Sequence, residues 1–145
     1  MQTHSQQSGQ RTTKKVEQWA HTPENIEKLP NPYEAKSADL TTRAKAWLHT
    51  NCASCHVEAG GGNAKMQLRF DTPLEKMKII NEKPVHTNFQ DPQAMLVAPG
   101  SPEHSVLLKR ISIRGKDQMP PLSTHVVDEA GVKLIREWIE SLPVK

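Results

Sequence analysis

Two stretches of the chain space their hydrophobic residues as an amphipathic helix does. The first predicts a helix over 39–50, whose apolar face is formed by Leu40, Ala44, Trp47 and Leu48. The second begins after Asp128, a good helix-capping residue, and is stopped by Pro143. Its apolar stripe consists of Leu134, Ile135, Trp138, Ile139 and Leu142. We therefore expect a helix at each end of residues 39–145.

Two shorter helices are predicted between them. Residues 72–75 have the form of a capping box with Pro73 at the first helical position, and the face that follows would bury Leu74, Met77 and either Ile79 or Ile80. Further on, Ser101 would cap a helix that Pro102 opens and that runs to about Ser112. Residues 59–63, 81–99 and 115–124 are expected to be loops. No segment predicts a strand, and the expected fold class is all-α.

Residues 1–38 differ from the rest because they are polar and show no sustained hydrophobic period. We expect this segment to be an N-terminal tether or a wrap over the surface, and residues 39–145 to be the folded domain. Trp19, Ile26, Leu29 and Tyr33 are the residues that could hold it on the domain. The first ten residues lack the apolar stretch of an export signal. An exported chain would therefore have lost its signal or be part of a longer one.

Composition indicates that side chains alone leave the core small. Hydrophobic residues make up 35% of the 145 residues and aromatic residues 4%, so that even with glycine added the apolar share stays below the roughly 45–50% usual for soluble domains. Another group is expected to complete the core. The net charge is +3, with both signs alternating, which disfavours nucleic-acid binding. No apolar run is long enough to cross a bilayer.

The strongest chemical signal is the stretch from Cys52 to His56, Cys-Ala-Ser-Cys-His, which contains both cysteines of the chain. This is the attachment sequence for c-type haem. Two thiols at this spacing can each form a thioether with one porphyrin, while the adjacent imidazole binds the iron. The alternatives are a thioredoxin-like redox pair, half of a zinc site and a simple disulfide. The motif predicts one haem c, covalently bound through Cys52 and Cys55, with His56 as an axial ligand.

With this motif the chain resembles monohaem, class I-like c-type cytochromes. The resemblance implies that the first and last helices cross near Ala44, and that a large side chain of the last helix, Ile135 or Trp138, packs there. Residues 96–107 and 119–122 are similar to those of bacterial cytochrome domains fused to, or encoded with, larger periplasmic oxidoreductases. The resemblance therefore implies a cytochrome c-like helical fold.

The resemblance also proposes Met119, in a loop with two prolines, as the sixth ligand of the iron. Other methionines, Met66, Met77 and Met95, are expected to pack in the core, and His86, His104 and His125 are expected to be solvated. A backbone carbonyl within 60–64 is expected to hold the second nitrogen of His56. Possible partners for haem propionates are Arg69, Arg110 and Arg114.

The predicted function is electron transfer with His/Met axial ligation, either accepting electrons from a periplasmic dehydrogenase or passing them along a respiratory chain. The partner would be a redox protein, the location periplasmic or otherwise exported, and no residue would be catalytic. A haem enzyme or gas-binding sensor with an open or displaceable sixth position is the alternative, and a thiol module without haem is a third reading.

Overall fold

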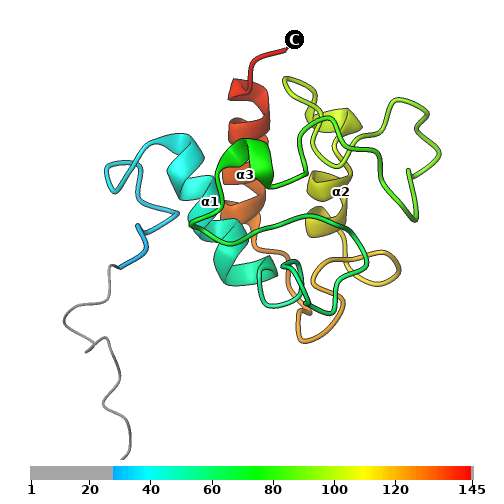
Figure 1. Ribbon diagram of the computed structural model, residues 1–145, viewed down its shortest axis with the longest axis horizontal. Helices are drawn as coiled ribbons and strands as arrows, with labels where there is room; N and C mark the ends of the chain where they lie inside the picture. The colour runs from blue at the N-terminus through cyan, green and yellow to red at the C-terminus, as the bar shows by residue number, and fades with distance from the viewer. Residues whose placement is uncertain (1–27, 145) are drawn as a thin grey trace, which may run out of the picture.

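The computed structural model describes residues 28–144. Three α-helices form in this part of the chain, α1 (Leu40–Cys52), α2 (Val106–Ser112) and α3 (Glu129–Ser141), with two short 3-10 helices, η2 (Leu74–Lys76) and η3 (Pro102–His104) (Figure 1). The β pairing within the described residues is limited to two isolated bridges. Three short helices joined by long loops are compatible with several folds. The cytochrome c-like fold therefore stays a prediction, as does the domain boundary at residue 39.

The helices at the two ends of the domain confirm the hydrophobic pattern. The carboxylate of Asp39 caps α1 by accepting a hydrogen bond from the Thr42 amide at 3.0 Å, and the helix runs two residues beyond the expected end. The carboxylate of Asp128 caps α3 in the same way, accepting from the amide of Gly131 at 2.9 Å. Both caps satisfy amides that have no partner within the helix.

The two middle helices were predicted too long. At 74–76 the chain makes a single 3-10 turn that follows Pro73, and no side chain caps it. The expected helix from Ser101 to Ser112 is divided at Ser105, whose backbone is extended. Ser105 is fully buried, and its hydroxyl donates to the carbonyl of Ser101 at 3.0 Å and accepts from the amide of Ala98 at 2.9 Å. These side-chain bonds to the backbone of the preceding turn hold Ser105 away from helical geometry, which the hydrophobic pattern could not show.

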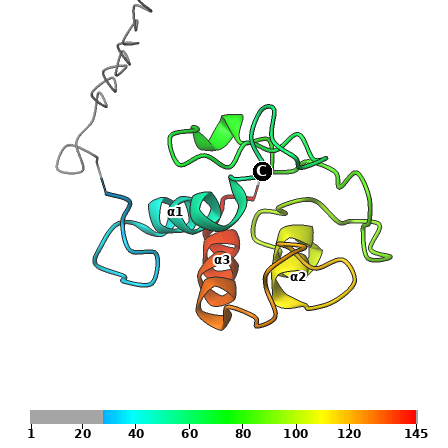
Figure 2. The ribbon, with the colours of Figure 1, turned by 90° about the horizontal axis from the view of Figure 1, so that it is seen from below.

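The core forms where α1 and α2 pack against α3 (Figure 2). Trp47 and Trp138 are buried packing residues, as predicted. Ala44 is buried too, but a second small residue at this contact was not expected. A Cβ added to Gly131 of α3 would overlap the Trp47 indole nitrogen. The glycine therefore lets the backbone of α3 approach the indole closely.

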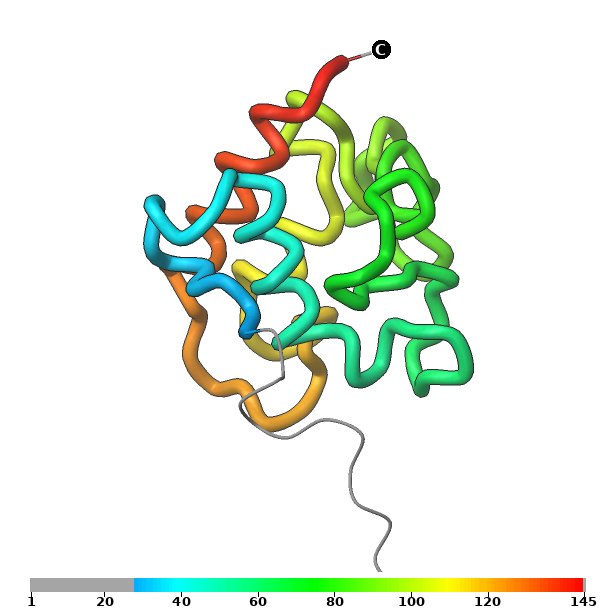
Figure 3. The backbone as a smooth tube through the Cα atoms, turned by 60° about the vertical axis from the view of Figure 1, so that its left-hand side comes forward, coloured from blue at the N-terminus to red at the C-terminus, as the bar shows by residue number. Residues whose placement is uncertain are grey.

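The long connection between α1 and α2 winds over the domain without an extended helix (Figure 3). Backbone hydrogen bonds fix its course. The amide of Leu68 donates to the carbonyl of His56 at 2.9 Å, and the amide of Val97 donates to that of Ile79 at 3.0 Å. Because these bonds join residues far apart in sequence, they give the irregular segment a defined shape.

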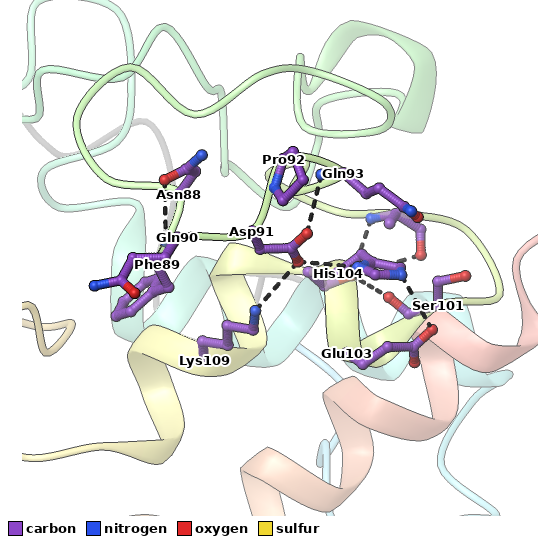
Figure 4. A network of polar contacts seen from close by, with 12 residues as sticks. Asn88, Phe89, Gln90, Asp91, Pro92, Gln93, Ser101, Glu103, His104 and Lys109 are labelled. Atoms are coloured by element: carbon purple, nitrogen blue, oxygen red, sulfur yellow. Dashed lines mark hydrogen bonds and ion pairs between the residues drawn. The ribbon is translucent and has the colours of Figure 1, made fainter.

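A polar network holds part of this connection against η3 and α2 (Figure 4). The Asp91 carboxylate lies 2.9 Å from Nδ1 of His104 and 3.3 Å from Nζ of Lys109, and it accepts from the Gln93 amide at 2.9 Å. The hydrogen bond to His104, followed by those to Gln93 and Lys109, lowers the pKa of Asp91 to about 2 against an opposing effect of burial. His104 was predicted to be solvated, but it is partly buried and paired.

The N-terminal segment lies outside the described residues up to residue 27, so the predicted contacts of Trp19 and Ile26 lie there too. Beyond it, the hydroxyl of Tyr33 donates to Asp128 at 2.6 Å, and the guanidinium of Arg43 donates to the carbonyl of Pro32 at 3.1 Å. Residues 32 and 33 are thereby held at the start of α3 and on α1. Within 28–144, no helix combines the length and apolar character needed to cross a membrane.

Candidate functional site

An apolar cavity of about 320 Å³ lies between the end of α1, α2 and three loops. The sequence motif contributes Cys52, Cys55 and His56 to its wall, and the proline-containing loop contributes Met119. These are the four residues predicted to form one binding site. The structure brings them to a common cavity, and their assignment to cofactor binding stays a prediction.

The geometry of the motif follows from the way α1 ends. The amides of Cys55 and His56 both donate to the carbonyl of Cys52, at 3.1 and 2.9 Å, so the chain turns tightly after the helix. The amide of Gly62 then donates to the carbonyl of Cys55 at 2.9 Å. A Cβ on Gly60 would overlap that same carbonyl, so glycine is required for this close return of the loop.

The two thiols differ in their surroundings. Cys52 is buried and Cys55 is exposed, and neither forms a disulfide. Burial, with a smaller contribution from Cys55, raises the pKa of the Cys52 thiol to about 12. Reactive thiol pairs usually stand at the start of a helix, where the dipole favours the thiolate, whereas Cys52 ends one. The geometry therefore disfavours a thioredoxin-like redox pair.

The imidazole of His56 is half-buried beside the cavity. Burial, together with the positive charge of Arg110, lowers its pKa below the usual range, which favours the neutral ring. Its Nδ1 atom is buried and has no hydrogen-bond partner in the structure. The expected carbonyl from 60–64 does not reach it. Instead the backbone of Gly62 lies so close that a Cβ there would stand 2.6 Å from Nδ1.

Met119 reaches the cavity from the loop that follows α2. Its amide donates to the carbonyl of Arg110 at 3.0 Å, and the guanidinium of Arg110 donates to the carbonyl of Asp117 at 3.1 Å. The Arg110 guanidinium also lies over the ring of Phe89, 5.8 Å from its centre. Arg110 therefore joins the two loops on either side of the cavity and places one cation in its wall.

The structure places some of the other candidate residues in the wall of the cavity and others away from it. Met66 and Met77 are buried in the core and His86 is exposed, as expected. Met66 and His86 also line the cavity, which was not expected, whereas Met77 does not. Arg69 is exposed and pairs with Asp71 at 3.0 Å, outside the cavity. Sequence reasoning missed one part of the site: Val106, Leu107 and Ile111 of α2 line the cavity. The hydrophobic stripe of this helix was the signal that could have indicated it.

The prediction of a covalently bound haem c is corrected by the structure. Within residues 28–144 no group of three or more histidine, cysteine, aspartate and glutamate side chains is placed to hold a metal ion. The two cysteines of the motif lie three residues apart, and within the described residues they do not form such a group with His56 or with any other side chain of these types. The structure therefore does not support haem c.

Comparisons with protein-family models, with curated proteins and with solved structures find no match. The resemblance to c-type cytochromes therefore stays a prediction that depends on the motifs.

Proposed function

We propose that this chain is an electron-transfer protein whose apolar cavity binds a flat, largely apolar organic redox group. The observation that carries the proposal is the convergence of Cys52, Cys55, His56 and Met119 on one cavity of about 320 Å³. That volume lies at the lower end of the range for small-molecule sites. Side chains from segments far apart in the sequence line this cavity, so the fold of the domain surrounds it.

The character of the wall supports a carrier rather than an enzyme. Leu68, Leu96 and Leu107 are buried residues of the wall, and they exclude water from the bound group. Fewer water dipoles then have to reorient when the charge of the group changes, which speeds electron transfer. The lining includes no carboxylate among the described residues, and its polar side chains are those of Asn51, Ser54, His56, Asn63, His86, Thr87 and Arg110. We infer that the group gains and loses electrons without bond chemistry on a substrate.

The chain's own thiols are a poor substitute for such a group. A dithiol carrier needs a thiolate at neutral pH, and the buried Cys52, with its pKa of about 12, supplies none. Cys55 is exposed and lines the same cavity. In this proposal the donor is a periplasmic dehydrogenase or another member of a respiratory chain, and the protein acts in the periplasm or another exported location.

The proposal is tested on protein produced by export in a bacterial host, with mass spectrometry of the intact chain and voltammetry of the adsorbed protein. We expect a mass or an extractable ligand beyond the polypeptide, and a reversible one-electron wave. A chain that has the mass of the bare polypeptide, yields no ligand and gives no wave would refute the proposal. A two-electron wave that disappears in Cys55→Ser would instead identify the thiols as the redox group and also refute it.

A matched pair of methionine variants locates the group. Met119→Leu changes the wall of the cavity, whereas Met77→Leu makes the same substitution in the core away from it. We expect Met119→Leu to shift the potential of the wave or lower the ligand content, and Met77→Leu to leave both unchanged. Equal effects of the two variants would place the group elsewhere.

A further inference from the structure

A second hollow lies beside the apolar cavity, with a polar and positively charged lining. Its volume is about 470 Å³, and it is bounded by residues 57–60 and 62–65 on one side and by residues from 67 to 78 on the other. Three lysines line it, Lys65, Lys76 and Lys78, together with one carboxylate, Glu58. All three lysines are exposed, and none forms an ion pair within the described part of the chain.

The backbone at this hollow adds a second feature that favours anions. Met77 is in the right-handed helical conformation and Lys78 follows it at φ 54°, in the left-handed region. Consecutive residues of this kind turn their N–H groups toward one side and form a nest that attracts anions. The amides of Lys78 and Ile79 have no acceptor among residues 28–144. Of these residues Lys78 lines the hollow, so a left-handed turn and a lysine side chain meet at this wall.

Uncharged donors complete the lining. The hydroxyl of Thr72 and the amide of Asn63 lie in the wall. Gln67 also lines the hollow, but its side-chain oxygen already accepts the amide of Glu58 at 2.8 Å, which fixes that edge of the loop. The surplus of positive charge over the single carboxylate is matched by a ligand with two negative charges and several acceptor oxygens.

We propose that this hollow binds a small, doubly charged oxyanion, with Lys65, Lys76 and Lys78 supplying the charge and Thr72 a hydrogen bond. Phosphate and dicarboxylates share the required chemistry. This site does not depend on the proposed electron-transfer function, since it shares with the apolar cavity only the thin wall at Gly62, Asn63 and Ala64.

The test is a titration of the isotope-labelled full chain by NMR at constant ionic strength. Inorganic phosphate is added in one series and succinate in another. We expect saturable shifts of the amides of Lys76 and Lys78 with at least one of the two anions, and the comparison of series identifies which. Saturation with neither anion, or shifts that chloride reproduces at equal ionic strength, would overturn the proposal.

Lysine variants test which side chains supply the positive charge of the hollow. Each of Lys65→Gln, Lys76→Gln and Lys78→Gln should weaken binding about three- to fivefold, because an exposed charge pair is worth up to about 1 kcal/mol. The triple variant should weaken it more than tenfold. Lys36→Gln, an exposed lysine outside the hollow, is the matched control and should leave affinity unchanged. Equal losses in the control and the triple variant would show a nonspecific charge effect and refute the site.

Discussion

Replacing Asp128 by alanine tests whether one carboxylate joins three parts of the domain. Its oxygens accept from the Gly131 amide at 2.9 Å, from the indole N–H of Trp47 at 2.8 Å and from the hydroxyl of Tyr33 at 2.6 Å. The first bond caps α3, the second ties α3 to α1, and the third holds the N-terminal segment. One side chain thus combines local and tertiary roles.

The expected loss can be worked out from these contacts. Removing a helix cap costs about 1 kcal/mol. The indole of Trp47 is buried, with 4% exposure, so leaving its N–H without an acceptor costs about 1–3 kcal/mol more. The Tyr33 bond is exposed and adds less. We expect Asp128→Ala to lower the free energy of unfolding in urea by about 2–4 kcal/mol.

Asp39→Ala is the matched control, because Asp39 caps α1 with the same geometry but bonds only within its own helix end. Its loss should be about 1 kcal/mol. Adding Trp47→Phe to Asp128→Ala should cost less than Trp47→Phe alone, because the indole N–H no longer has a partner to lose. If Asp128→Ala is no more destabilising than Asp39→Ala, the tertiary bonds contribute nothing and the reasoning is refuted.

The Asp128 carboxylate also makes the stability of the protein depend on pH in the acid range. Burial acts to raise the pKa of Asp128, but hydrogen bonds from Tyr33, Gly131 and Trp47 outweigh it and hold the pKa below the usual value. A carboxyl with a lowered folded pKa stabilises the protein above its unfolded pKa, and this contribution is lost as the pH falls through the folded pKa. The acid slope of stability should therefore be shallower in Asp128→Ala than in the parent chain.

Three further outcomes follow from the structure. Gly131→Ala should lower the free energy of unfolding in urea, although alanine normally favours a helix, because its Cβ would overlap the Trp47 indole. The control is Gly61→Ala, whose Cβ would meet nothing within 4 Å and which should leave that free energy unchanged. The pKa of Asp91 is lowered to about 2, so its carboxylate stabilises the folded state increasingly as the pH rises from 2 to the usual carboxyl pKa. Asp91→Asn should therefore make the free energy of unfolding depend less on pH in this range, and an unchanged dependence would contradict the ion-pair assignment. Iodoacetamide at mildly alkaline pH should add one label to the folded polypeptide, at the exposed Cys55 and not at the buried Cys52, and peptide mapping that finds Cys52 labelled first would show that its burial is wrong.

The sequence predicted well those elements whose signal is local. Asp128 caps α3 as expected, and α1 begins one residue after Asp39, close to its expected start, because a cap and an amphipathic stripe are both encoded within about a dozen residues. It failed at Ser105, which looks like an ordinary helical residue but has an extended backbone, with its hydroxyl bonded to the Ser101 carbonyl and the Ala98 amide of the preceding turn. The close packing of Gly131 on an indole was also hidden, since it depends on how two helices approach.

The candidate site, too, could be predicted from the sequence only in part. The cysteine and histidine motif is contiguous, so its place at one cavity could be expected, and a methionine beside two prolines was a fair second candidate. What the sequence could not supply is the orientation of the groups around His56. Its buried Nδ1 has no partner, although the loop returns closely enough to touch the ring. A buried polar atom without a partner costs free energy in the folded chain.

The loop that contains Gly62 joins the two hollows of the domain. Gly62, Asn63 and Ala64 form part of the wall of each, so any movement that gives Nδ1 of His56 a partner also changes the shape of the lysine-lined hollow. Coupling between two binding sites is reciprocal: if filling the apolar cavity changes the affinity for an oxyanion, the oxyanion changes the affinity of the cavity by the same factor. Because the shared wall is a short glycine-containing loop rather than a packed helix, it is the part of the structure best suited to carry such coupling.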